Sequence, residues 1–328
     1  MARSVAIVGA GQIGYSAWYC LGDMGHIATV HARSKPTWLA GFDDHFSWYR
    51  LDADKAPEAE VVFDTIAFDA EDVERYDPDR VGRLILVSSA SVYCDAEGRT
   101  LNDAAENGFP EFVRPIAEAQ TTVAAGPETY STRKIRMEER ALDLFGDRVT
   151  ILRPCAVYGA HSRHPREWWF VKRMLDGRPI IPLACGGSSR FQTTNADLIG
   201  DFVVATAEKD LAGIYNLADA TAATVQEIGE TIARMLDADI RFDGFEGYPD
   251  HGVGRTPWSV PRPFIIDGTK AKREGGLATV RYEVEAEEAV RWLQSYNPGD
   301  WRAAFPQLAA YPWDLFDYAA EDKVLALL

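Results

Sequence analysis

The chain has 328 residues, of which 47% are hydrophobic, enough for one large core or for two. Its 34 lysines and arginines stand against 50 aspartates and glutamates, a formal net charge of −16, so its average surface repels nucleic-acid phosphates and anionic lipid headgroups. Four dispersed cysteines without a CxxC pair predict neither disulfides nor a zinc site. No apolar run reaches the roughly 20 residues of a membrane span, and the chain opens on a strand instead of a signal peptide. We therefore expect a soluble cytoplasmic protein without nucleic-acid or membrane partners.

Uninterrupted apolar runs in the first half of the chain predict buried strands. They fall at residues 5–8, 27–30, 61–63, 84–87 and 149–152. Helical stretches separate them, and this alternation is typical of βαβ units in a parallel sheet covered on both faces. We predict a doubly wound α/β domain over residues 1–160, with a later segment near 190–217 returning to it.

The second half of the chain has a looser pattern. Proline, glycine and tryptophan gather at 161–169 and 244–263, where long loops are expected to shape a pocket. The aromatic segment 300–328 is expected to pack across the body of the protein or on a partner subunit. Residues 161–328 are thus predicted to form a smaller C-terminal α/β region that binds substrate and carries this extension.

Helical periodicity returns three times in this second half. The stretches are 195–207, 224–236 and 286–295. The middle one begins with Thr224 followed by Glu227, which has the form of a capping box. The first stretch lies in the segment predicted to return to the N-terminal domain, and the other two supply helices of the predicted C-terminal region.

A glycine turn follows the first predicted strand directly. Gly9, Gly11 and Gly14 form a GxGxxG pattern, and Gln12 and Ile13 lie where it opens into a helix. The pyrophosphate of a dinucleotide binds backbone N–H groups at such a helix N-terminus, where a Cβ atom would block its approach. Directly after a buried strand the pattern indicates a dinucleotide site, against the alternative of a tight turn that binds nothing.

The end of the second predicted strand bears on the choice of cofactor. A carboxylate there would bind the adenosine ribose and indicate NAD. The residues present are Arg33 and Ser34, followed by Lys35, and this group suits the 2′-phosphate of NADP. We predict NADP, with NAD as the alternative if these residues form a solvated basic loop.

A tyrosine and a lysine suggest acid/base chemistry. Tyr130 and Lys134 form a YxxxK pattern on one face of a predicted helix, which in isolation is often only a solvated face. A tyrosine is a poor acid or base at neutral pH unless positive charge stabilises its phenolate, and a lysine one turn away supplies such charge. The strand at 84–87 delivers the hydroxyls of Ser88, Ser89 and Ser91 at its carboxyl end, where doubly wound sheets bind ligands. We therefore predict that one of these hydroxyls holds a substrate oxygen while Tyr130, assisted by Lys134, moves its proton.

Five stretches of the chain together resemble the short-chain dehydrogenase/reductase superfamily, specifically its extended branch, the NAD-dependent epimerase/dehydratase family. They are the glycine turn and residues 88–93, 130–134, 152–159 and 213–217. The resemblance runs in the family's order from residue 5 to about residue 295, and it implies a Rossmann fold with a bound dinucleotide.

The resemblance also implies roles for individual residues. Tyr130 would be the acid/base, Ser89 the catalytic hydroxyl, and Lys134 the residue that holds the nicotinamide ribose and lowers the pKa of Tyr130. Ala67 and Pro154 would lie beside the cofactor. Family members frequently form a homodimer through two long helices that flank the active site, in a four-helix contact, and the resemblance implies the same here.

Departures from the family pattern bear on the substrate. Ala90 and Ser91 stand where sugar 4,6-dehydratases carry Asp-Glu, so we do not expect that dehydration. Ala156 stands where sugar-nucleotide epimerases commonly carry an asparagine that contacts substrate. Arg190, by contrast, matches an arginine that meets phosphate in sugar-nucleotide members.

The expected function is that of an NAD(P)-dependent dehydrogenase or reductase acting on a carbonyl or alcohol carbon of a small molecule. A redox-neutral sugar-nucleotide epimerase is the first alternative, and a non-catalytic dinucleotide-sensing regulator is the second. No metal is expected, because His161 and His164 lie in a loop without a carboxylate or cysteine cluster. Trp168, Trp169 and Phe170 suit either an apolar substrate pocket or plain core packing.

Overall fold

The computed structural model describes residues 2–247 and 252–327 and divides the chain into two compact units. Unit 1 consists of Met1–Cys155, Ala196–Ala218 and Ile266–Thr279. Unit 2 consists of Ala156–Asn195, Asp219–Ile265 and Val280–Leu328. The division falls at Cys155, before the boundary at residue 160 that the sequence suggested. Of the segment near 190–217, residues 196–217 return to unit 1, and Ile266–Thr279 returns as well, which the sequence did not predict.

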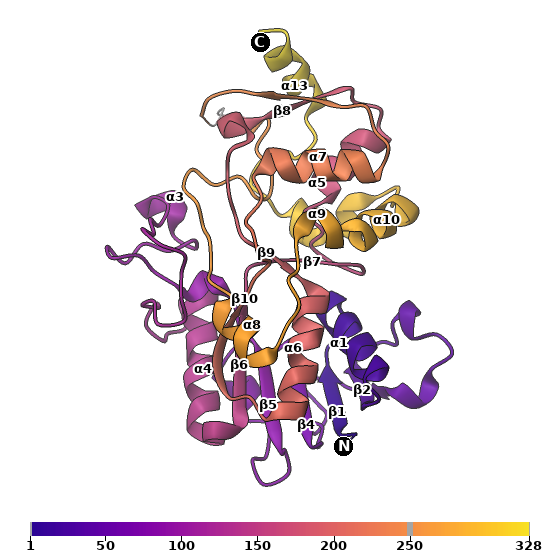
Figure 1. Cartoon of the computed structure of the whole chain (residues 1–328), viewed down its shortest axis with the longest axis vertical. Helices are drawn as coiled ribbons and strands as arrows, with labels where there is room; N and C mark the ends of the chain where they lie inside the picture. Colours follow the sequence, from indigo (N-terminus) through magenta and orange to yellow (C-terminus); the bar gives the residue numbers. More distant parts are fainter. Residues whose placement is uncertain (1, 248–251, 328) are drawn as a thin grey trace. The chain divides into compact units, whose positions relative to one another are not determined.

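A seven-stranded sheet forms the centre of unit 1, with the strand order β10-β6-β5-β4-β1-β2-β3 (Figure 1). Its strands are β1 (Ser4–Val8), β2 (Ile27–Ala32), β3 (Phe46–Trp48), β4 (Val61–Asp64), β5 (Arg83–Val87), β6 (Val149–Pro154) and β10 (Gly213–Leu217). Every pair of neighbours is parallel, which confirms the doubly wound α/β fold. The five strands predicted from apolar runs are all present. The sequence missed β3, whose three residues are too few for a recognisable run.

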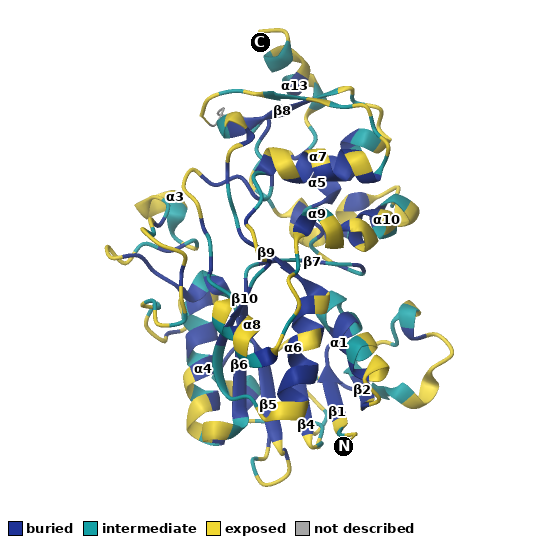
Figure 2. Ribbon diagram, in the orientation of Figure 1, coloured by how far each residue is buried: buried dark blue, intermediate teal, exposed yellow. Residues whose placement is uncertain are grey.

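Helices cover both faces of this sheet. The helices of unit 1 are α1 (Gln12–Asp23), α2 (Ala70–Val73), α3 (Ala104–Asn107), α4 (Tyr130–Phe145), α6 (Ala196–Lys209) and α8 (Thr269–Gly275), with 3-10 turns η1 (Thr37–Leu39), η2 (Asp43–His45), η3 (Ala90–Val92) and η4 (Gly146–Arg148). α3 has no buried residue and lies in a loop away from the sheet (Figure 1). On one face of the sheet, Val62 belongs to the same buried cluster as Met137 of α4. On the other face, Ile7 lies close to Gly14 of α1. Figure 2 shows the central strands buried, as expected when both faces are covered.

The connection between β4 and β5 contains only a short helix. α2 has 4 residues, whereas α4 has 16. The outer face of α4 is charged and paired with acidic groups around α2, in that Arg133 lies 2.7 Å from Asp69 and Arg140 lies 2.9 Å from Glu74. The four-helix dimer contact that the resemblance implied needs two long helices beside the site, and the described part of unit 1 has only α4 in that position.

The described residues of unit 2 form short strands and seven helices. The strands β7 (Ala156–Tyr158) and β9 (Thr193–Asn195) pair in parallel, as do β8 (Ile180–Leu183) and β11 (Arg241–Gly244). The helices are α5 (Trp168–Leu175), α7 (Val225–Met235), α9 (Tyr282–Glu285), α10 (Glu287–Tyr296), α11 (Trp301–Ala304), α12 (Pro306–Ala309) and α13 (Tyr318–Leu325), with the 3-10 turn η5 (Ala184–Gly187). The predicted capping box is confirmed at the start of α7. Part of the predicted loop 244–263 lies outside the described residues.

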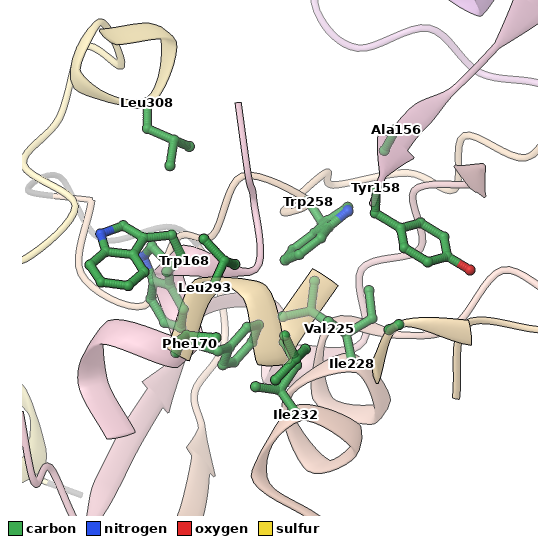
Figure 3. Packing of buried hydrophobic residues seen from close by; sticks show 14 of the residues in the cluster. Ala156, Tyr158, Trp168, Phe170, Val225, Ile228, Ile232, Trp258, Leu293 and Leu308 are labelled. Carbon is green, nitrogen blue, oxygen red and sulfur yellow. The ribbon is translucent and has the colours of Figure 1, made fainter. Parts of the chain in front are cut away.

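Aromatic side chains fill the core of unit 2. Trp168, Trp169 and Phe170 of α5 are buried there, so the structure supports core packing over a substrate pocket (Figure 3). The aromatic C-terminal segment contributes to the same core through Trp301 and Phe305. Among the described helices none combines the length and apolarity needed to cross a bilayer. Within the described ranges no group of three histidines, cysteines or carboxylates could hold a metal ion.

Candidate active site

The three glycines of the turn after β1 have different physical reasons to be glycine. Gly9 has a φ of +107°, and a Cβ atom on it would lie 2.2 Å from Thr65 Oγ1. A Cβ atom on Gly14 would lie 2.1 Å from the carbonyl oxygen of Gly9. Packing within the protein therefore requires glycine at both positions. On Gly11, by contrast, a Cβ atom would meet no described atom within 4 Å, so this glycine leaves open space in front of α1.

The N-terminus of α1 suits an anionic group in that space. Gly11 is its N-cap, no side chain caps it, and its first turn holds no acidic residue. Gln12 and Ile13 are the first two residues of the helix, and the Gln12 Oε1 atom is buried without a hydrogen-bond partner among the described residues. The open position at Gly11 and the uncapped amides fit a dinucleotide pyrophosphate, whereas the Gln12 oxygen, an acceptor, needs a donor such as a ribose hydroxyl.

The residues after β2 differ in how free they are. Lys35 forms an ion pair with Asp43, so its charge is already compensated. Arg33 and Ser34 are exposed, and Arg33 forms no ion pair with any residue that the structure describes. Of the basic residues in this loop, Arg33 is thus the one available to a phosphate group.

Ser89 and Tyr130 lie at the starts of η3 and α4, and these two elements contact each other. Ser89 follows β5 and is the N-cap of η3, where its Oγ accepts from the Ser91 amide at 3.1 Å. Tyr130 is the first residue of α4, and Ser131 beside it donates to the carbonyl oxygen of Ser91 at 2.8 Å. This link ties the start of α4 to η3, and the Ser89 hydroxyl is near enough to the Tyr130 phenol to lower its pKa.

Burial raises the pKa of Tyr130, and the hydrogen bond with Ser89 opposes that shift. The residue as a whole is 44% exposed. One ring face packs against Phe68, with centroids 5.4 Å apart. Tyr130 is therefore a protonated phenol at neutral pH, reachable from one side.

Lys134 is buried one turn further along α4, only 5% exposed. Its Nζ donates to the carbonyl oxygens of Ala67 at 2.6 Å and of Val87 at 2.9 Å. It lies 5.8 Å from the centroid of the Tyr130 ring. An ammonium has three N–H donors, so one remains for a further partner. Burial lowers the pKa of Lys134 to about 8, which leaves the side chain charged at neutral pH.

Ala67 and Pro154 mark the two flanks of this site. Ala67 lies beyond the end of β4 at Asp64, and its buried carbonyl receives Lys134. Pro154 ends β6 and is buried beside Leu217 of β10 in register. Both residues are thus at the carboxyl edge of the sheet.

A buried polar network next to Ser89 was not predicted from the sequence. Glu138 of α4 forms an ion pair with Arg153 of β6 and accepts a hydrogen bond from Ser88. The Arg153 guanidinium lies 4.9 Å from the Tyr93 ring, whose hydroxyl donates to Asn216 at 2.7 Å. An arginine next to the apolar run 149–152 was the available signal, since a charge in a buried strand needs a partner.

Three further sequence candidates lie in unit 2. Arg190 donates to the carbonyl oxygen of Ala222 and lies 3.7 Å from Glu227, so it is engaged within that unit. His164 is neutral at physiological pH because burial lowers its pKa to about 3. The ring of His161 packs on Trp292 at 5.6 Å. Neither histidine belongs to a metal-ligating group within the described part of the chain.

Comparison with solved structures finds this fold in NAD-bound enzymes. The UDP-glucuronic acid 4-epimerase of Bacillus cereus is 16% identical with a TM-score of 0.65, over 90% of this chain and 100% of its own. The dTDP-glucose 4,6-dehydratase of Bacillus anthracis is 17% identical with a TM-score of 0.63, over 92% of this chain and 100% of its own. The enzyme WbmH of Bordetella bronchiseptica is 15% identical with a TM-score of 0.66, over 90% of this chain and 100% of its own.

No protein-family model matches the sequence, and no curated protein matches it significantly. At identities of 15% to 17%, structural likeness establishes the fold alone. It does so over nearly the whole chain and agrees with the motifs found in the sequence. The chain therefore has the fold of the NAD-dependent sugar-nucleotide epimerases and dehydratases, as its resemblance to the extended short-chain dehydrogenases/reductases implied.

Proposed function

We propose that the chain is an NAD(P)-dependent oxidoreductase of the short-chain dehydrogenase/reductase type, with Tyr130 as its acid/base. The observation that carries this proposal is the Ser131–Ser91 hydrogen bond that places Tyr130 at the start of α4 beside Ser89, with the buried ammonium of Lys134 one turn further along α4. Ser89 and the carbonyl partners of Lys134 follow β4 and β5, and β4 pairs with the strand that leads into the glycine turn. Doubly wound sheets bind ligands at this edge.

The residues divide the chemistry between them. A nicotinamide bound at this edge would supply the hydride or accept it. Ser89 would hold the substrate oxygen, and Tyr130 would give that oxygen a proton in reduction or take one in oxidation. Because burial raises the pKa of Tyr130, its phenolate needs a neighbouring positive charge, and Lys134 supplies it.

We propose NADP as the preferred cofactor, with NAD as the alternative that the NAD-bound solved structures favour. Support for NADP is the unpaired charge of Arg33 and the lack of a carboxylate at the end of β2. The test is fluorescence titration of the protein with NADPH and with NADH. Arg33→Ala is expected to weaken NADPH binding about tenfold, or ~1.4 kcal/mol, and to leave NADH binding unchanged. Lys35→Ala, whose charge is already paired, is the control, and equal Kd values for the two cofactors would refute the preference.

A redox-neutral sugar-nucleotide epimerase is the second candidate. It is favoured by the solved structures, which include UDP-glucuronic acid and UDP-N-acetylglucosamine 4-epimerases of Bacillus cereus. Ala156, where such enzymes commonly carry a substrate-binding asparagine, argues for the oxidoreductase. An epimerase would use Tyr130 and Ser89 in the same way but return the hydride to the same carbon.

One assay separates these candidates. Purified protein is incubated with NADPH or NADH and a panel of aldehydes and ketones, and separately with nucleotide sugars whose products are read by NMR. Net consumption of reduced cofactor supports the oxidoreductase. A changed sugar configuration without net consumption, together with cofactor released only on denaturation, supports the epimerase. Cofactor binding with neither activity would favour a dinucleotide-sensing regulator.

The role of Tyr130 has its own test. Tyr130→Phe is expected to lower turnover ~10²–10⁴-fold, because it removes the proton donor but keeps the ring. Cofactor affinity and thermal stability should change little. Tyr19→Phe is the matched control, since Tyr19 is exposed on α1. Turnover retained in Tyr130→Phe would overturn the assignment of the acid/base.

A homodimer remains part of the proposal, but on a different surface from the one that the resemblance implied. α2 has 4 residues, so a second copy must bind elsewhere than on a pair of long helices. We expect light scattering to give the mass of two chains and to be unaffected by Arg140→Glu on the outer face of α4. The mass of one chain would refute the dimer.

A further inference from the structure

We propose that Asp64 is a positioning residue of the active site, which braces the turn after β4 and, through the Ala67 peptide group, holds the Lys134 ammonium in place and charged. The inference rests on the proposed function, because it assigns a role to a residue that supports Lys134. Asp64 itself is buried and touches neither Ser89 nor Tyr130 in any recorded contact.

The contacts of Asp64 form a continuous path to Lys134. One carboxylate oxygen, Oδ1, accepts from the Ile66 amide at 2.7 Å and from the Ala67 amide at 2.8 Å. The other, Oδ2, accepts from the Tyr76 hydroxyl at 2.6 Å. The carbonyl oxygen of Ala67 in turn accepts from Lys134 Nζ at 2.6 Å. The carboxylate thus fixes the peptide chain that receives the ammonium.

Lys134 is the cation on the path of contacts that begins at the Asp64 carboxylate. The three hydrogen-bond donors of that carboxylate are two backbone amides and a phenol, all neutral. A buried carboxylate without a compensating positive charge is costly, and so is a buried ammonium without a negative one. Each therefore stabilises the charged form of the other across one peptide group.

The other groups around Lys134 do less for its charge. The titratable groups that face it are Asp64 of β4, Asp72 of α2, and Glu138 and Tyr130 of α4. Glu138 is already paired with Arg153. Asp72 is partly solvated and accepts the amides of Phe68 and Asp69 at the start of α2. Of the groups that raise the pKa of Lys134 against its burial, Asp64 is the strongest.

The variant that tests this is Asp64→Asn. It keeps the shape and an acceptor for the two amides, and its Nδ2 can donate to the Tyr76 hydroxyl, so charge is the main loss. Tyr76→Phe is the matched control, because it removes one hydrogen bond to the carboxylate and keeps the charge. The readout is the ¹⁵Nζ signal of Lys134 followed against pH, assigned by its absence in Lys134→Met.

We expect the wild-type signal to titrate at a pH of about 8. In Asp64→Asn the proton affinity of Lys134 should fall about tenfold. In Tyr76→Phe the fall in the pKa of Lys134 should be less than half as large. The pH profile of turnover should move to lower pH in step with the signal. An unchanged titration in a folded Asp64→Asn variant would overturn the proposal even if turnover fell.

This experiment distinguishes failure of the inference from failure of the proposed function. The titration of Lys134 needs neither cofactor nor substrate, so it reports on Asp64 even if the protein turns nothing over. Should Asp64→Asn fail to fold, Asp64→Ser takes its place, since it keeps one acceptor and leaves room for a water molecule. Normal titration in Asp64→Ser would then overturn the proposal.

Discussion

Each of the two units buries an arginine–glutamate ion pair, and the two pairs have different structural roles. In unit 1, Glu138 of α4 pairs with Arg153 of β6, 15 residues apart in sequence, and the same carboxylate receives Ser88 beside the candidate site. In unit 2, Arg173 of α5 pairs with Glu321 of α13, 148 residues apart. The first pair supports a site within a regular sheet, whereas the second fastens the end of the chain to a core with little regular sheet.

The surroundings of the two arginines differ accordingly. The Arg173 guanidinium lies 3.5 Å from the centroid of the Trp169 ring and 4.9 Å from that of Phe316, and it also donates to the carbonyl oxygens of Trp169 and Leu315, each at 2.7 Å. Four partners thus hold one buried cation. These contacts of Arg173 join α5 to the C-terminal segment. From the sequence alone, that segment was predicted only to be aromatic and packed.

Removing the buried contacts of Arg173 should give the largest loss of stability. Arg173→Met is expected to lower the free energy of unfolding by ~3–5 kcal/mol, because it leaves Glu321 buried without its partner. Arg153→Met in unit 1 should cost a similar amount and also lower turnover, because Glu138 and Ser88 lie beside the site. Urea denaturation gives the stabilities, and the activity assay separates the two variants.

The control for this comparison is an exposed pair. Arg291 and Glu287 of α10 lie 3.5 Å apart on the surface, so Arg291→Met should cost less than about 1 kcal/mol. The double variant Arg173→Met, Glu321→Met should recover much of the loss, since it removes the stranded charge. Equal losses from Arg291→Met and Arg173→Met would contradict the role of burial.

The same contrast explains what could be predicted from sequence. The strands of unit 1 and the glycine turn follow from local patterns, because a buried parallel strand is a continuous apolar run and the turn needs glycine at fixed spacing. Ser89, Tyr130 and Lys134 could be predicted because each lies in a short motif at the end or start of an element. These signals span a few residues each.

The rest depends on contacts between distant parts of the chain. Nothing near Arg173 indicates that its partner is Glu321, and nothing near Asp64 indicates that it supports Lys134. The shortness of α2 was not predicted, because the resemblance implied two long helices beside the site. Trp168 and its neighbours were ambiguous, since apolar aromatic side chains suit a core and a pocket equally well.

Buried carboxyl groups sharpen the comparison and predict a pH effect. Asp64 in unit 1 accepts three hydrogen bonds, whereas Glu167 in unit 2 has the Tyr282 hydroxyl at 3.4 Å as its side-chain donor. Burial raises the pKa of Glu167 from 4.5 to about 7. The folded state therefore binds this proton more tightly than the unfolded state. The stability that this provides is complete below pH 4.5 and is lost as the pH rises through about 7.

Glu167→Gln mimics the protonated form at every pH. Its unfolding free energy, relative to that of the wild type, should rise by up to ~3 kcal/mol between acidic and mildly alkaline buffer. Urea denaturation at several pH values measures this difference. Glu283→Gln, at an exposed position on α9, is the control and should show no such trend. A parallel pH dependence in Glu167→Gln and wild type would show that Glu167 is not the group responsible.

The smallest effect compares one capping device used in both units. Thr224 begins α7 in unit 2, where its Oγ1 accepts the Glu227 amide at 3.1 Å, and Thr129 begins α4 in unit 1, where its Oγ1 accepts the Thr132 amide at 3.2 Å. Thr224→Ala and Thr129→Ala should each cost ~1 kcal/mol of unfolding free energy, because each leaves a helix amide uncapped. Only Thr129→Ala should also lower turnover, since Tyr130 is the next residue and its ring position depends on how α4 begins. A loss of turnover in Thr224→Ala equal to that in Thr129→Ala would show that the cap acts through overall stability and not through the placement of Tyr130.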